Sequence, residues 1–444
     1  MVPSKTSHKK ACIHDKTYQL RLLPYSDLLN TELSIEYHSQ QEPSPMKKYY
    51  TNSLPKFALN FLVLILRIFG LFPFRFNESK KRFNMSISLF IYSIVALVAY
   101  VYFIGLYYWT TLWSVLSQPT RYNVVLLFVS LVAAYCGVLV NKLTILVFAS
   151  EFQRLLNDFY RLWISLHIGC DGNRDRKLLN RFLFKMIVID QGWYWRLFIA
   201  TPTCRWLVHF YNALYTAFNF SVEAIVANLI IAVAYLGGHY FRMINLKIVR
   251  LHQKWNTLER GQTYSKLNSE GKRHLCEKIS IELSRLMIGH EKVNRTILKF
   301  MQLHDASMVL IQLKNFVVII MGVFIACVTT VNDIRRNRTP SFGIYGYLAV
   351  LSVFHFIQFY YLMASASLFT KRGDKTGQIV DFMIAREHDD ELDIHAFSME
   401  LLHRDNKIYS FGLFPIDFSL LYVSLGSMAN YLIVSIQLQI QEFE

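Results

Sequence analysis

Sequence motifs of the common enzyme classes are missing from this chain of 444 residues. It has no phosphate-binding glycine loop, no GxGxxG, no GxSxG and no HExxH. Its 14 histidines do not gather at metal-ligand spacing, and its 6 cysteines form no CxxC pair. We therefore expect that the protein is not an enzyme and that it binds neither a cofactor nor a metal.

Long apolar runs dominate the chain instead. Hydrophobic residues make up 53% of it and aromatic residues 15%, and they come in blocks rather than at the periods of soluble helices or strands. A helix that crosses a bilayer needs about 20 apolar residues. Asp190, Arg196 and Arg205 interrupt the third block. We expect seven spans, near residues 86–108, 123–148, 186–210, 218–241, 308–331, 343–368 and 413–436.

The basic residues indicate the orientation of these spans. No signal peptide opens the chain, and residues 1–50 are polar and basic, so we expect the amino terminus in the cytoplasm. Seven crossings then put 39 of the 47 Lys and Arg on the cytoplasmic side, as the positive-inside rule requires. This distribution explains the net charge of +16 without a nucleic-acid partner. The carboxyl terminus lies outside, which is opposite to the arrangement of G-protein-coupled receptors.

The expected fold class is all-α, a polytopic membrane protein with seven transmembrane helices and long cytoplasmic helix extensions. An extra crossing by Leu54–Phe74 is the alternative to a pre-helix there, and it would reverse the carboxyl terminus. The expected parts are a mobile cytoplasmic tail (1–53), an amphipathic or re-entrant pre-helix (54–84), helices 1–4 as part of a ligand-binding bundle (85–241), a cytoplasmic helical anchor segment (242–306), helices 5–6 (307–368), a second anchor segment (369–412), and the last helix with an outer tail (413–444).

A heptad-like apolar seam precedes the fifth span. Its spacing alternates between 4 and 3, which predicts a helix that packs against other helices of the same assembly and runs into the span near Met308. The acidic stretch 381–400 could dock on the basic 242–306 segment, although two solvated faces are the alternative. The seam residues are Ile279, Leu283, Leu286, His290, Val293, Ile297, Phe300 and His304.

The last span carries a polar stripe. Ser427, Asn430, Val434, Gln437 and Gln441 recur at spacings of 3, 4, 3 and 4, which places them on one face of a helix. Polar groups within hydrocarbon are costly unless they face protein or water. The stripe predicts either a pore lining or a helix–helix interface, and the spacing alone does not choose between the two.

Residues around this stripe resemble the signature of the insect gustatory receptors. That signature is a Gly-Leu-Phe-x-(Ile/Leu)-Asp lead-in, then Thr-Tyr, five apolar residues and Gln-Phe. Asn430 stands here for the threonine and Leu438 for the phenylalanine. The stretch Leu66–Phe74 is similar to the segment before the first helix of these receptors. The matching residues are Gly412, Leu413, Phe414, Ile416, Asp417, Tyr431 and Gln437.

The resemblance implies a tastant-gated, non-selective cation channel in the plasma membrane of sensory neurons. Four copies, of this chain or with related receptors, would surround a pore that conducts Na, K and Ca ions. Tyr431 and Leu438 would pack beside the pore face. Sugar receptors of the family carry an acidic residue after the tyrosine, so Leu432 favours a bitter or aversive tastant. A sugar-responsive subunit and a secondary transporter are the alternatives, although no internal repeat of the transporter kind is present.

The tastant and membrane lipid are the other expected partners. Aromatic residues in the outer half of the bundle could line the tastant pocket, or they could serve as interfacial anchors. Glu223 could contact the ligand or form a structural pair. We expect Lys142 to snorkel to the cytoplasmic interface and Gly237-Gly238 to mark close helix packing. The candidate ligand residues are Tyr102, Trp109, Tyr211, Tyr215, Glu223 and Tyr345.

Overall fold

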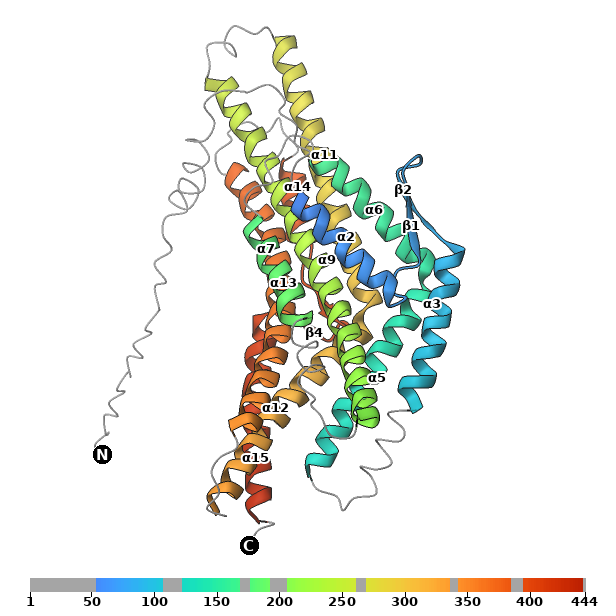
Figure 1. The fold of residues 1–444 in the computed structure, drawn as a ribbon. Helices are drawn as coiled ribbons and strands as arrows, with labels where there is room; N and C mark the ends of the chain where they lie inside the picture. The colour runs from blue at the N-terminus through green and yellow to red at the C-terminus, as the bar shows by residue number, and fades with distance from the viewer. Residues whose placement is uncertain are drawn as a thin grey trace, which may run out of the picture. The chain divides into compact units, whose positions relative to one another are not determined.

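In the computed structural model, helices follow the apolar blocks of the sequence (Figure 1). The polytopic all-α class is confirmed, with two small β-hairpins that the sequence did not indicate. Residues 57–444 form one compact unit. The expected tail, apart from Ser53, lies outside the described residues. The structure describes residues 53–106, 122–167, 176–191, 206–260, 269–335, 342–384 and 394–441.

The segment before the first span is a helix followed by a hairpin. The helix ends where Gly70 adopts a φ of +68°, a left-handed conformation that glycine adopts without strain. Pro73 follows, and the chain turns into two antiparallel strands. The first elements are α2 (Ser53–Ile68), β1 (Phe74–Asn77), β2 (Arg82–Met85), α3 (Ile87–Ala99) and the π-helical η1 (Tyr100–Ile104).

Lys142 holds this segment against the bundle. Its Nζ donates a 2.5 Å hydrogen bond to the Phe69 carbonyl, at the end of α2, and the residue is only 2% exposed. The expectation that Lys142 snorkels to the interface is therefore wrong. The free carbonyls at the end of a helix carry partial negative charge, so an ammonium is stabilised there without reaching water.

Five described helices are long and apolar enough to cross a membrane. A shorter apolar stretch, Ile87–Phe103, coincides with the first expected span. The third expected span starts in η3, but residues 192–205 lie outside the described part of the chain. The five helices are Phe128–Val147, Ser221–Trp255, Asp305–Val331, Leu348–Ile384 and Phe418–Gln437.

Two expected boundaries are wrong. One helix, α9 (Trp206–Arg260), contains the end of the expected third span, the whole fourth span and the start of the anchor. No proline interrupts the sequence between Trp206 and Arg260, and the helix continues without a break. The last helix begins at Phe418 rather than near 413, because Phe414–Pro415 is a strand.

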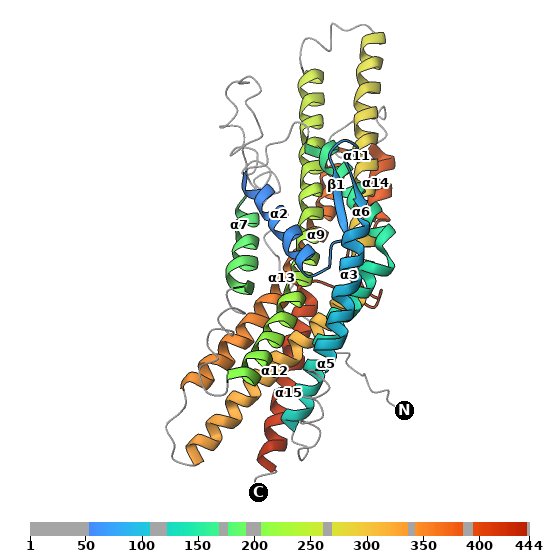
Figure 2. The ribbon, with the colours of Figure 1, turned by 45° about the vertical axis from the view of Figure 1, so that its right-hand side comes forward.

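The remaining elements follow in chain order. Figure 1 shows α11 beside α9, and Figure 2 shows α15 beside α12. They are α5 (Tyr122–Val147), α6 (Ala149–His167), α7 (Arg176–Phe184), η3 (Lys185–Gln191), α11 (Ser269–Leu303), α12 (Asp305–Arg335), α13 (Phe342–Ile384), α14 (Ile394–Leu402), β3 (Tyr409–Ser410), β4 (Phe414–Pro415) and α15 (Phe418–Gln441).

All eight residues of the heptad-like seam are buried, and their helix α11 packs on α9 and α6. We expected this helix to run unbroken into the fifth span, but it does not. It stops at Leu303, and α12 begins at Asp305. At the junction, the His304 backbone N–H bonds to the Met301 carbonyl instead of the Phe300 carbonyl, which tightens the last turn. The Phe300 carbonyl instead accepts the His304 ring N–H, at 3.1 Å.

The continuation of α13 docks on α9 through hydrogen bonds. Asn245 of α9 donates to the Arg372 carbonyl and accepts from the Thr376 hydroxyl, at 3.0 and 2.7 Å. His290 of α11 stacks on Phe241, and burial together with the nearby Arg404 guanidinium lowers the pKa of His290 to about 3. His290 is therefore neutral in the folded protein. The acidic residues of 387–393 lie outside the described part of the chain.

At Gly237, α9 approaches both α11 and α13 closely. A Cβ at this position would lie 2.7 Å from Phe369 Cδ2 and 2.8 Å from Ile297 Cγ1. Such distances are shorter than carbon atoms tolerate, and both neighbours are fully buried. The expected close packing at Gly237 is confirmed.

Gly237→Ala should therefore destabilise the bundle by about 1–3 kcal/mol, the usual cost of overpacking. The measurement is the melting temperature of the detergent-solubilised protein, followed by fluorescence-detected gel filtration. The control is Gly289→Ala on α11, where an added Cβ meets no atom within 4 Å. Alanine there should be neutral or stabilising by up to about 1 kcal/mol. Equal melting temperatures for the two variants would contradict the packing argument.

Candidate functional site

The lead-in to α15 is a tight hairpin that ends in a helix cap. Phe411 and Gly412 have φ of +50° and +70°, as a type I′ turn requires, and they join β3 to β4. The Asp417 carboxylate then accepts hydrogen bonds from the backbone N–H groups of Ser419 and Leu420, at 2.8 and 3.3 Å. The Gly and Asp of the lead-in thus have physical roles, because they turn the chain and start the last helix.

α15 packs on α12 and α13 through a narrow seam. Leu421, Met428 and Ser435, spaced by seven residues, are buried. The remaining faces of α15 are open. Only 17% of its apolar segment is buried, whereas 78% of the apolar segment of α9 is buried. α15 is therefore a peripheral helix of the single chain, with most of its surface available to lipid or to another subunit.

The polar stripe lies on the open side of α15. Asn430, Val434 and Gln437 are exposed, and Ser427 is partly so. At about 100° per residue, these positions lie roughly opposite the buried seam. The stripe is thus not an interface within the chain. Gln441 ends the helix, and its side chain lies outside the described set.

The motif tyrosine lies at the border between the seam and the stripe. The Tyr431 ring meets Phe316 of α12 edge to face, with the centroids 6.0 Å apart, yet 56% of the residue is exposed. Its carbonyl accepts the Ser435 hydroxyl at 2.6 Å. Leu438 continues the same helix, but its side chain is not among those described.

The described structure does not bring the expected ligand residues together. Tyr102 in η1 is 64% exposed and touches Phe103. Trp109 lies outside the described residues. Tyr211 and Tyr215 are on α9 and Tyr345 is on α13, but their side chains are outside the described set.

Glu223 of α9 forms a buried ion pair with Lys314 of α12. The two residues are 5% and 2% exposed. One residue further along α12, the Asn315 side-chain oxygen lies 2.7 Å from His355 Nδ1 of α13. Of the two roles that we considered for Glu223, the structure therefore has the structural ion pair. A ligand would have to compete with Lys314 to reach this carboxylate.

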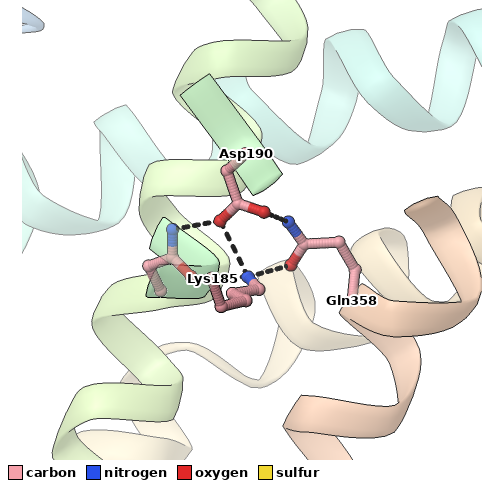
Figure 3. Close-up of polar contacts among 4 residues, drawn as sticks. Lys185, Asp190 and Gln358 are labelled. Atoms are coloured by element: carbon pink, nitrogen blue, oxygen red, sulfur yellow. Dashed lines mark hydrogen bonds and ion pairs between the residues drawn. The ribbon is translucent and has the colours of Figure 1, made fainter. Parts of the chain in front are cut away.

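A second buried ion pair has a complete hydrogen-bond shell. Lys185 and Asp190 of η3 are fully buried, and the Lys185 ammonium lies 2.9 Å from an Asp190 carboxylate oxygen (Figure 3). The same ammonium donates to the side-chain oxygens of Asn228 and Gln358, both at 2.6 Å. All three ammonium protons are thereby used.

The two amides close this network on the other side. Asn228 Nδ2 and Gln358 Nε2 donate to the two Asp190 oxygens, at 2.6 and 2.7 Å. The π-helical turn of η3 brings both charges of the pair to the same neighbours on α9 and α13. Because every charge is compensated, the cluster holds three helices in register and leaves no free charge for a ligand.

Comparison with known proteins now identifies the family. The model of the 7tm chemosensory receptor family matches residues 59–442. This chain is a 7tm chemosensory receptor. The insect olfactory receptor OR5 of Machilis hrabei has a similar fold, with a TM-score of 0.57 at 14% identity, over 87% of this chain and 99% of that one. Its complex with eugenol gives 0.55 at 12% identity, with the same coverage. A search of curated proteins finds no match.

The neutral partners of the receptor's buried charges were not predicted from the sequence. Asn228, Asn315 and Gln358 are amides within apolar helices, and each contacts an ionisable residue or its neighbour. A survey of Asn and Gln inside the spans would have found these residues, because an amide in hydrocarbon needs a partner as a charge does. Their pairing could not be read from spacing, since the partners are on different helices.

Asp190→Asn should destabilise the receptor by about 3–5 kcal/mol, because it leaves the Lys185 charge buried without a counter-ion. Lys185→Met in the same chain should restore most of this loss by removing that charge. Melting temperature and folded yield of the purified receptor measure both effects. Arg154→Ala, which breaks an exposed pair with Glu151, is the control and should change stability by less than about 1 kcal/mol. If the double variant is no better than Asp190→Asn, charge compensation is not the role of the pair.

Proposed function

We propose that this receptor is a gustatory receptor that acts as a tastant-gated, non-selective cation channel. The observation that supports it best is the exposed polar stripe on α15, a helix otherwise apolar enough to cross a membrane. An amide that faces hydrocarbon without a partner costs roughly 2–7 kcal/mol. Four copies that turn their stripes toward a common axis would remove this cost and create a water-filled path.

The side chains of the stripe suit such a path. Gln437 amides from four subunits would form a ring whose carbonyl oxygens replace part of the hydration of a cation. Val434, 50% exposed in the single chain, would form an apolar constriction that resists wetting when the channel is closed. Ser427, Asn430 and Gln441 would line the path on either side, with Tyr431 and Leu438 packed behind it.

The ligand is proposed to be a bitter or otherwise aversive small molecule. Leu432, which follows Tyr431, lacks the carboxylate that the sugar receptors of the resemblance carry. A small organic ligand agrees with the eugenol complex of the Machilis hrabei receptor. Tyr102, Trp109, Tyr211, Tyr215 and Tyr345 remain the proposed lining of the pocket.

The proposed orientation places the amino terminus in the cytoplasm of a sensory neuron and the carboxyl terminus outside. Epitope tags at Met1 and Glu444 test it in intact and permeabilised cells. We expect the Glu444 tag to stain intact cells and the Met1 tag to stain only after permeabilisation, because the basic loops resist translocation. If both tags stay hidden in intact cells, the number of crossings is even and the seven-span topology is wrong.

A cysteine at Gln437 tests the pore directly. Cells that express the Gln437→Cys receptor would be exposed to bitter alkaloids, sugars and eugenol, and then to a positively charged methanethiosulfonate reagent. We expect the reagent to abolish most of the evoked current, because it adds a cation to the narrow path.

Ala429→Cys is the matched control for this experiment. Ala429 is exposed but lies about 80° around the helix from Gln437 and further from the rest of the stripe, so a lipid-facing thiol there should not react with a charged reagent. Equal block at both positions, or none at Gln437 with currents intact, would contradict the pore assignment. Currents evoked by sugars alone would exclude a bitter ligand, and uptake of a compound without current would indicate a transporter.

A further inference from the structure

The β1–β2 hairpin carries four cations in eight residues. Arg75, Lys80, Lys81 and Arg82 are all exposed, and Glu78 is the one acidic residue between Phe74 and Met85. None of the four forms an ion pair with another residue of the described structure. Their charges are therefore not compensated by an ion pair within the described part of the chain.

The strand register puts the arginines on the outer face. Phe76 pairs with Phe83, and Asn77 pairs with Arg82. Side chains of paired residues point to the same side of a hairpin, and successive ones alternate. The aromatic pair therefore faces one way, and Arg75 and Arg82 face the other.

The aromatic face is fixed against α6. The Phe76 ring meets Phe83 and Tyr160 of α6, with centroids 5.1 Å apart in each case. Asn157 of α6 also bonds the edge of the hairpin, accepting from the Phe83 N–H at 2.7 Å and donating to its carbonyl at 3.1 Å. The hairpin is thus held rigidly, with its basic face turned away from the protein.

The hairpin is also fixed at the end of the first apolar stretch. Ile87 begins α3 and is 75% exposed, five residues after Arg82. Such a length of chain spans at most about 17 Å. Arg67 of α2 donates to the Phe74 carbonyl at 2.9 Å, and Tyr92 of α3 donates to the Ile68 carbonyl at 2.6 Å. These bonds hold Arg75 and Arg82 within about this distance of the level where the apolar helix surface starts, and Lys80 and Lys81 lie beyond them in the turn.

We propose that the basic face of the β1–β2 hairpin binds the anionic headgroups of the adjacent membrane leaflet. Lys and Arg beside a transmembrane helix attract anionic lipids, and each contributes about fivefold in affinity. The rigid hairpin presents its cations together, without a cost for ordering a flexible loop. In the proposed orientation this leaflet is the cytoplasmic one, but the binding itself does not depend on channel function.

The test counts lipids bound to the purified full-length chain in detergent by native mass spectrometry. Phosphatidylserine and phosphatidylcholine are added separately, so charge is the main difference. The wild-type chain should retain phosphatidylserine at least about tenfold more tightly. The variant Arg75→Gln/Lys80→Gln/Lys81→Gln/Arg82→Gln should lose this preference.

A control with equal charge removes four exposed cations of α11, namely Arg273→Gln/Lys278→Gln/Arg285→Gln/Arg295→Gln. It should keep the preference for phosphatidylserine, because these residues are not on the hairpin. The variant Arg75→Lys/Arg82→Lys keeps the charge and should bind like wild type, which shows that binding follows charge and not the shape of the guanidinium group. An unchanged melting temperature of the quadruple variant shows that its loss of binding does not come from misfolding. Soluble glycerophosphoserine, which has the headgroup without the chains, should compete poorly.

Three results would overturn the proposal. The quadruple hairpin variant could bind phosphatidylserine as wild type does, or the α11 control could lose the preference equally, so that binding follows net charge. Glycerophosphoserine could also displace the lipid at equal concentration, which would indicate a free-anion site instead of a lipid surface. Since no current is recorded, these results are distinct from a failure of the channel experiments.

Discussion

Pairing of charges inside the helix bundle is the constraint on which the rest of this receptor depends. Hydrocarbon cannot solvate a charge, so each buried ion must find its partner within the protein. Lys185 is linked to Asn228, 43 residues away, and to Gln358, 173 residues away. The Glu223–Lys314 pair joins α9 to α12 in the same way. These bonds allow one register of the central helices and exclude sliding by a turn.

The outer face of α15 obeys the same constraint with a different solution. Its Asn430 and Gln437 have no cover in the single chain, whereas the amides Asn228 and Gln358 in the core are satisfied. One fold thus contains internally satisfied amides and amides that require a neighbour from outside. The proposed assembly follows from this difference, because further copies of the chain would give the amides of α15 the polar surroundings that the bundle gives to the amides of its own core.

Patterns local in sequence predicted the fold well. The seam from Ile279 to His304 and the contact at Gly237 arise from helical periodicity and residue size, and both were found as expected. The expected stripe on α15 does lie on one face, and its role as a pore lining stays a prediction. The end of the third span and the role of Lys142 could not be predicted. They depend on where a helix continues and on which distant carbonyl an ammonium meets, and periodicity does not contain this information.

The attachment of α15 restricts how a ligand could open the proposed pore. α15 contacts α12 and α13 along one seam, and the β3–β4 hairpin joins its start to the anchor, with the Ile416 N–H bonded to the Ile408 carbonyl at 2.8 Å. Because charge pairs fix α9, α12 and α13 to one another, a ligand would have to move α12 and α13 as a unit. It could favour the open state only by its difference in affinity for the two arrangements. Gating would then be a movement of α12 and α13 together relative to α15, in which the buried ion pairs stay intact.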